Sequence, residues 1–167
     1  GNTAVGYLAG YTFGNYSNST AIGQTSYITA SDQVRIGGTV LNPTSSIGGW
    51  VNWTAISDGR FKKDVSRDIH GLDFIMKLQP VSYFMNRTAL AQFLHCSDSL
   101  SGNKIANADK IRFNGFIAQD VAAAAKEVGY DFSGIDFPKN ETDYFGLRYA
   151  EFVVPLVKAV QEQQKEI

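Results

Sequence analysis

The stretch "AISDGRFKKD", residues 55–64, lies where two segments of different composition meet. Before it, residues 1–48 are rich in glycine and carry only two charged side chains, Asp32 and Arg35. After it, charged residues alternate with apolar ones at the spacings of helices and strands. The chain therefore divides into two parts, 1–48 and 49–167, which we expect to fold by different rules.

The first part repeats itself. The segment "NTAVGYLAG" at 2–10 aligns with "STAIGQTSY" at 19–27, and a weaker third copy, "QVRIGG", follows at 33–38. A short strand followed by glycine, recurring at about one coil, is typical of a β-solenoid. Each copy supplies so few apolar residues that a single chain cannot bury a sufficient core. We therefore expect a β-rich stalk, a β-solenoid or β-prism, that several chains build together around one axis.

The second part mixes helix and strand patterns and is expected to be α+β. Apolar residues at helical spacing in "GLDFIMKLQP" (71–80) predict a helix, and "DVAAAAKEVG" (120–129) predicts another that Gly129 ends. Strand patterns occur in "VNWTAI" (51–56), "PVSYFMN" (80–86), "IRFNGFIAQD" (111–120) and "TDYFGLRY" (142–149). The polar segment 88–110 is expected to form a loop or a variable hairpin.

A C-terminal helix is expected over about 150–167. Its apolar seam has spacings of three, four, three and four residues and consists of Val153, Leu156, Val160, Gln163 and Ile167. Such spacing is that of the a and d positions of a coiled coil, with one polar member. An amphipathic helix packed on its own domain would show a similar pattern. Together with the repeats, the seam favours helices of several chains that meet as a coiled coil.

Composition and charge argue against several classes of function. The charged side chains nearly cancel at −1, so no overall field favours nucleic acid or an anionic membrane. No run approaches the roughly 18 apolar residues that span a bilayer. The single cysteine, Cys96, excludes an internal disulfide, and its neighbour His95 has no further His or Cys nearby to complete a metal site. We therefore expect no nucleic-acid, membrane, metal or cofactor binding.

Ser57 precedes Lys62 by five residues and can be interpreted as half of a serine–lysine dyad. A neutral amine can take the proton of a serine hydroxyl, which then attacks a carbonyl. Lysine normally holds its proton up to about pH 10.4, so it needs desolvation or neighbouring cations such as Arg60 and Lys63. A salt bridge between Asp58 and Lys62 would oppose the loss of the proton from Lys62. The spacing alone also fits a solvated turn that contains this salt bridge.

Four blocks of the second part resemble a known family when they are taken together. They are "SDGRFKKDV" (57–65), "GLDFIMKLQPVSYFM" (71–85), "GFIAQDV" (115–121) and "YFGLRYAEFVVPLVKAVQEQ" (144–163). The pattern resembles the C-terminal intramolecular chaperone domain of phage tail spikes and fibres, the self-cleaving domain of endosialidase type. The first part separately resembles the repeats of trimeric adhesin heads, which also occur in phage fibres.

This resemblance implies a homotrimer whose C-terminal domain assists the folding of the fibre or spike upstream in the same polypeptide. It implies a single, intramolecular cut at the Ile56–Ser57 bond by a serine endopeptidase with a Ser-Lys dyad. Ser57 would be the nucleophile and Lys62 the general base. Asp58 and Arg60 would belong to the motif as orienting or structural residues. An N-to-O acyl shift followed by ester hydrolysis fits a serine that attacks the carbonyl immediately before it.

The same resemblance implies where the two products act. The mature stalk would belong to the tail fibre or spike of a virion. The chaperone part would be released in the host cytoplasm after assembly.

Three other functions compete with this interpretation. The chain could be a structural trimerisation tip that never cleaves, in which case Ser57→Ala would change no product. It could be a receptor-binding tip whose aromatic residues contact a host glycan, the candidates being Trp50, Trp53, Tyr130 and Phe132. A conventional serine hydrolase is disfavoured, because the chain lacks a G-x-S-x-G elbow and a His/Asp pattern for Ser57. His70 is expected to precede a helix rather than to act in catalysis.

Overall fold

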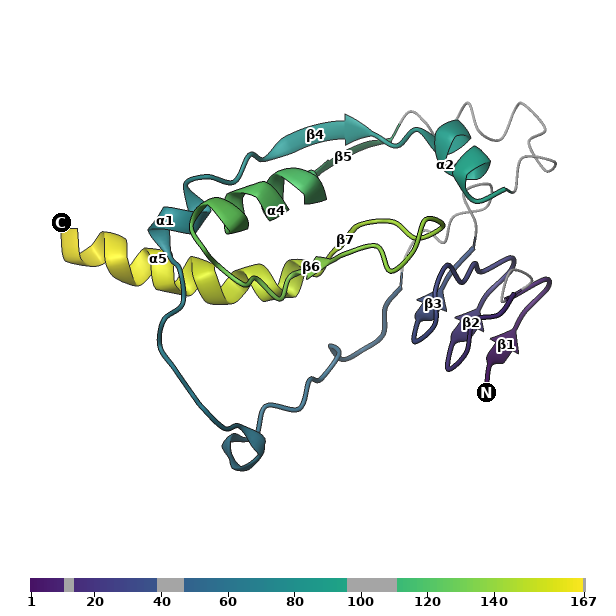
Figure 1. Ribbon diagram of the computed structural model, residues 1–167, viewed down its shortest axis with the longest axis horizontal. Helices are drawn as coiled ribbons and strands as arrows, with labels where there is room; N and C mark the ends of the chain where they lie inside the picture. Colours follow the sequence, from purple (N-terminus) through teal and green to yellow (C-terminus); the bar gives the residue numbers. More distant parts are fainter. Residues whose placement is uncertain (11–13, 39–46, 96–110, 167) are drawn as a thin grey trace. The chain divides into compact units, whose positions relative to one another are not determined.

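The computed structural model describes residues 1–10, 14–38, 47–95 and 111–166 (Figure 1). The chain forms two compact units, each assembled from three segments. Unit 1 consists of Gly1–Trp50, Ser82–Phe113 and Pro138–Tyr144, and unit 2 of Val51–Val81, Asn114–Phe137 and Phe145–Ile167. The repeats thus lie in unit 1, together with two segments from later in the sequence.

Three short strands of unit 1 form a parallel sheet in the order β1-β2-β3 (Figure 1). They are β1 (Thr3–Val5), β2 (Thr20–Ile22) and β3 (Val34–Ile36). The pairing register aligns Val5 with Ile22 and Ile22 with Ile36, as the alignment of the three sequence copies predicts. Successive copies of the repeat therefore lie one above the next.

A glycine follows each strand because the backbone there leaves no room for a side chain. Gly6 has φ +128°, and a Cβ atom on it would lie 2.8 Å from the main chain of Gly23. Gly23 has φ +112° and would bring its Cβ within 3.1 Å of the main chain of Gly37. A non-glycine residue at these positions would be strained and would push neighbouring coils apart.

The interior of the stack is small and partly polar. Ala21, Ile28 and Ala30 are buried, but so are Ser19, Ser26 and Thr29. The buried hydroxyls are hydrogen-bonded: that of Ser19, for example, donates to the carbonyl oxygens of Ser17 and Ala30. The aligned apolar residues Val5, Ile22 and Ile36 remain exposed. The three residues form an apolar stripe along the stack.

Helix α2 (Arg87–Phe93) lies in unit 1, and strand β4 (Val81–Phe84) pairs with β5 (Arg112–Gly115). The expectation of a loop from residue 88 is wrong for the described part of that segment. Asn86 caps α2 by accepting from the main-chain N–H of Ala89, and buried Ala91 packs against apolar neighbours that include Tyr27. Residues 96–110, with Cys96, lie outside the described residues.

Unit 2 has a mixed α+β core, as the patterns predicted. Helix α1 (Leu72–Ile75), helix α4 (Ala118–Glu127) and the strands β6 (Ile135–Asp136) and β7 (Gly146–Leu147) surround it. The buried side chains are Phe74, Val121, Ala124, Ala125, Phe132, Ile135 and Phe152. Gly129 follows the cap of α4 with φ +70°, which confirms its role as the helix stop.

Two expectations for unit 2 are wrong. Residues 51–56 form no strand, since they pair with no other strand among the described residues and their side chains are exposed. Of the strand expected over 142–149, only β7 forms. Its partner β6 was not predicted, because a strand of two residues shows no periodic pattern. Phe132 is buried and Tyr130 packs against it and Phe74, so these two aromatics serve the core and not a glycan surface.

A short 3₁₀ turn, η3 (Tyr149–Phe152), leads into the C-terminal helix α5 (Val153–Glu166). Pro155 stands in its first turn, where proline is tolerated. The helix packs against α1, and Glu162 of α5 accepts a hydrogen bond from the main-chain N–H of Leu72 at 2.8 Å.

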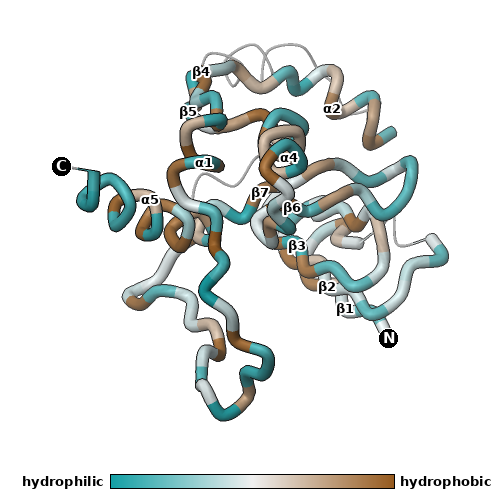
Figure 2. The backbone as a smooth tube through the Cα atoms, turned by 60° about the vertical axis from the view of Figure 1, so that its left-hand side comes forward, coloured by the Kyte–Doolittle hydropathy of each residue, from teal (hydrophilic) through white to brown (hydrophobic). Residues whose placement is uncertain are grey.

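The buried face of α5 is not the predicted seam. Pro155 and Ala159 are buried, whereas Val153, Leu156 and Val160 are exposed, Val160 to 62%. Figure 2 shows the first half of α5 as hydrophobic and its C-terminal end as hydrophilic. The helix thus packs on its own unit with one face and leaves an apolar seam on the other.

Candidate active site

Ser57 lies at the start of a tight turn in the long connection between residues 51 and 71 of unit 2. The turn is the 3₁₀ helix η1 (Gly59–Phe61), and it begins because the Asp58 carboxylate accepts a hydrogen bond from the main-chain N–H of Arg60 at 2.9 Å. The main-chain N–H of Lys62 donates to the carbonyl of Gly59 and closes the turn. Asp58 acts here as a helix N-cap.

The turn brings the side chain of Lys62 back to Ser57. The Nζ atom of Lys62 donates a hydrogen bond to the Oγ atom of Ser57 at 2.9 Å. That distance lies within the range over which a general base takes a proton from a nucleophile. The two residues of the predicted dyad are therefore in contact.

Asp58 pairs with Arg60 rather than with Lys62. The Arg60 Nη2 atom lies 2.6 Å from Asp58 Oδ2, and its Nε atom lies 3.1 Å and 3.0 Å from the two carboxylate oxygens. The alternative interpretation, a salt bridge from Asp58 to Lys62, is wrong. It fails because the guanidinium fork of Arg60, two residues away, matches both carboxylate oxygens at once.

The ion pair fixes the charge of both partners near neutral pH. The side-chain hydrogen bond from Arg60, aided by its main-chain N–H, holds the pKa of the Asp58 carboxyl below its ordinary value. The same contact raises the pKa of the Arg60 guanidinium. Asp58 is thus an anion engaged with a cation, and it does not draw the Lys62 amine away from Ser57.

The side chains around the Ile56–Ser57 bond are exposed and many are apolar. Ile56 is 89% exposed, and Phe61 and Val65 on the other side of Ser57 are also exposed. Trp53 stands exposed just upstream. The sequence contains these apolar residues, but nothing in it indicated that their side chains would be exposed.

The two histidines take no part in this turn. His70 pairs with Asp73 at 2.6 Å across the start of α1 and packs against the ring of Tyr130, as expected of a residue before a helix. The hydrogen bond from His70 lowers the pKa of Asp73. His95 follows α2, and its neighbour Cys96 lies outside the described residues.

Two other kinds of site were searched for in the described part of the chain. No group of three or more His, Cys, Asp or Glu residues there could hold a metal ion. Of the helices described, none is both long and apolar enough to cross a bilayer.

Comparison with known proteins agrees with the geometry of the turn. The model of the peptidase family described as chaperone of endosialidase matches residues 57–130. Searches of curated proteins and of solved structures gave no match. The matched segment begins at Ser57 and continues through α1 and α4. The match over residues 57–130 confirms the resemblance to the chaperone domain of endosialidase-type tail proteins.

Proposed function

We propose that this chain is an intramolecular chaperone, joined to the end of its own client, that cuts itself between Ile56 and Ser57. The observation that carries the proposal is the 2.9 Å contact between Lys62 Nζ and Ser57 Oγ. The family match that begins at Ser57 supports it.

In the proposed reaction, neutral Lys62 takes the hydroxyl proton of Ser57 as Oγ bonds to the carbonyl carbon of Ile56. The Ile56–Ser57 C–N bond then breaks, and the proton passes to the nitrogen, which becomes the amino group of Ser57. An ester now joins Ile56 to Ser57 Oγ. Water hydrolyses this ester, which restores the Ser57 hydroxyl and leaves a carboxylate on Ile56. The reaction occurs once per chain.

We propose that assembly into a homotrimer gates the cut. Lysine keeps its proton at neutral pH unless water is excluded from it, and both Ser57 and Lys62 are exposed in the single chain. The chain also leaves two apolar surfaces free, the stripe of Val5, Ile22 and Ile36 and the seam of α5. Burial of such surfaces between chains, with the α5 helices as a coiled coil, would cover the turn and favour the neutral amine.

The client in this proposal is the repeat-containing stalk, whose coils would form a β-solenoid or β-prism shared by three chains. The matching family is described as a chaperone of endosialidase, which supports a client in the same chain. We propose that the stalk ends up in a virion tail fibre or spike and that residues 57–167 leave it in the host cytoplasm.

The test is the mass of the freshly purified protein under denaturing conditions, compared with Ser57→Ala. Fragments that end at Ile56 and begin at Ser57 in the wild type, with an intact variant, would support the proposal. Ser66→Ala, a serine in the same connection, is the matched control and should cleave normally. The native mass should be three times that of the chain.

A non-cleaving trimerisation tip is the second candidate, and the exposure of the turn favours it. In that case wild type and Ser57→Ala would both stay whole in a protein shown to be trimeric.

A further inference from the structure

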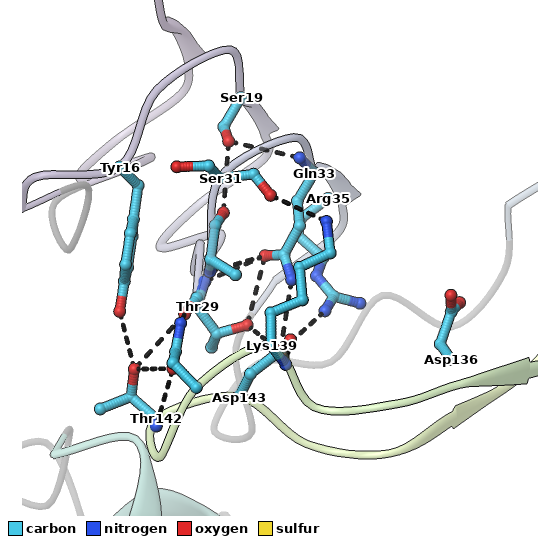
Figure 3. A network of polar contacts seen from close by, with 12 residues as sticks. Tyr16, Ser19, Thr29, Ser31, Gln33, Arg35, Asp136, Lys139, Thr142 and Asp143 are labelled. Carbon is cyan, nitrogen blue, oxygen red and sulfur yellow. Dashed lines mark hydrogen bonds and ion pairs between the residues drawn. The ribbon is translucent and has the colours of Figure 1, made fainter.

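The loop of residues 138–144, part of unit 1, is bound to the repeats through a buried carboxylate (Figure 3). The side chain of Asp143 is only 5% exposed. Its Oδ1 atom accepts a hydrogen bond from the Thr29 hydroxyl at 2.6 Å and one from the Gln33 amide at 3.3 Å. The same oxygen lies 3.8 Å from the Arg35 guanidinium. Three different side chains of the repeats thus converge on one oxygen.

Other residues of the loop add contacts around this centre. The side chains of Asn140 and Thr142 donate to the carbonyl oxygen of Thr29 at 3.0 Å and 3.3 Å. Lys139 Nζ donates to the carbonyl oxygen of Ser31 at 3.0 Å. The hydroxyls of Thr142 and Tyr16 lie 2.7 Å apart. The Lys139 main-chain N–H donates to Asp143 Oδ2 and holds the loop in shape. The loop therefore contacts both the backbone and the side chains of the repeats.

The side chains that meet Asp143 distinguish the third coil from the two before it. Arg35 aligns with Ala21 in the second coil, which aligns with Ala4 in the first. Gln33, one residue before the strand of its coil, corresponds to Ser19 and, in the first coil, to Asn2. Neither earlier coil offers a guanidinium and a long amide at these positions. The loop is thus matched to the last coil before the junction.

The proposed cut places the two sides of this contact on different products. Thr29, Gln33 and Arg35 would belong to residues 1–56, and Asp143 to residues 57–167. Ala91 of α2, which packs near Tyr27 of the repeats, would also stay with the second product. Hydrolysis of the Ile56–Ser57 bond breaks none of these contacts.

We propose that the loop of residues 138–144 is a latch that recognises the third coil and keeps the 1–56 product bound to the 57–167 product after the chain is cut. This inference rests on the cleavage proposed above. Separation of the products would require Asp143 to be rehydrated and its three partners to be left without their acceptor, which makes separation slow. Cleavage and release are then two separate steps.

The test uses the full chain with Ser57→Ala, a C-terminal affinity tag, and the recognition site of a site-specific protease in place of the exposed residues 51–55. After that protease has cut, the tagged fragment is captured and the loss of the N-terminal fragment is followed over time. The N-terminal fragment should stay bound. Asp143→Ala should speed its loss about tenfold or more, because charge-assisted hydrogen bonds are lost.

The matched control is Asp136→Ala. Asp136 lies on β6 close in sequence to the loop, and it pairs with Arg148. Its replacement should leave retention unchanged. Since Asp143→Ala removes a buried group, two variants on the repeat side of the contact are tested as well. Gln33→Ala and Arg35→Ala should also speed the release of the N-terminal fragment.

Two results would overturn the latch. One is immediate loss of the N-terminal fragment from the parent chain, and the other is unchanged retention in Asp143→Ala, Gln33→Ala and Arg35→Ala alike. Self-cleavage is measured separately, by denaturing mass of the chain with Ser57 intact. A chain that never cuts itself would refute the proposed function and leave the retention assay valid.

Discussion

The side-chain amine of Lys62 donates a 2.9 Å hydrogen bond to the hydroxyl of Ser57 across one 3₁₀ turn. The contact is local, because the turn closes within six residues and needs no other part of the chain. The chemistry proposed for this contact depends on something the turn cannot supply, the exclusion of water from the amine. The predictions below separate the geometry of the turn from its environment.

Lys62→Ala should abolish self-cleavage, slowing it by about a hundredfold or more, because the general base is removed. Lys62→Arg should be equally inactive, since a guanidinium does not give up its proton in a protein. Arg67→Ala, a basic residue of the same connection outside the Ser57–Lys62 turn, is the control, and it should cleave like the wild type. The measurement is the fraction of cut chain over time on a denaturing gel. Cleavage by Lys62→Ala at the wild-type rate would refute the dyad.

Asp58→Ala should slow cleavage by about tenfold, since the loss of the N-cap loosens the turn that presents Lys62 to Ser57. It also leaves the Arg60 guanidinium without its carboxylate. Asp68→Ala, in the same connection, is the control. The rates come from the same time course, and an unchanged rate for Asp58→Ala would show that the cap does not position the dyad.

Val160→Asp should weaken the proposed trimer by about tenfold or more, because it would place an unpaired charge in the α5 seam. The fold of the single chain should persist, since Val160 is 62% exposed in it. Native mass spectrometry gives the oligomeric state, and circular dichroism gives the helix content. Gln161→Asp, the adjoining exposed position, is the control. A trimer that survives Val160→Asp unchanged would place the interface elsewhere.

Gly6→Ala should destabilise the stack of repeats by about 1–3 kcal/mol, because φ is +128° and the new Cβ would meet the main chain of Gly23 at 2.8 Å. Gly48→Ala should have little effect, since nothing lies within 4 Å of a Cβ there. Thermal unfolding measures the difference. Equal midpoints for the two variants would mean that the first coil contributes little to stability.

The latch should hold at neutral pH and fail in acid. Burial raises the pKa of the Asp143 carboxyl. Hydrogen bonds from the side chains of Thr29 and Gln33 and from the main chain of Lys139 and Tyr144 lower it by more, so the pKa lies below its ordinary value of 3.8. The charged group that faces Asp143 is the Arg35 guanidinium, 3.8 Å away. A lowered carboxyl pKa stabilises the contact above 3.8, and this stabilisation is lost as the pH falls through the pKa of the folded state.

The retention assay measures this directly when it is repeated from pH 7 down to pH 3. Retention of the N-terminal fragment should be constant from pH 7 to about pH 5 and should fall below pH 4. Asp143→Asn should remove the acid dependence. Loss of retention already between pH 7 and pH 5 would assign the control of release to a different group.

Local patterns in the sequence predicted the elements that depend on near neighbours. The repeated "TAV" and "TAI" predicted the register of β1 on β2, because stacked coils place equivalent residues opposite each other. Gly129 predicted the end of α4. The contact between Ser57 and Lys62 was predicted from their spacing together with the resemblance to a known family. A single turn suffices to bring the two side chains together.

The sequence by itself determined the repeats and the α4 and α5 helices, since these follow from periodicity, whereas the Ser57–Lys62 pair was predicted from the resemblance to a known family. Only the tertiary structure decided that α5 buries Pro155 and Ala159 and not its seam, and that Asp143 meets Thr29. The last contact joins residues 114 positions apart. No local pattern encodes such pairings, because they depend on which surfaces remain free after each segment has folded, and on which partner then reaches them.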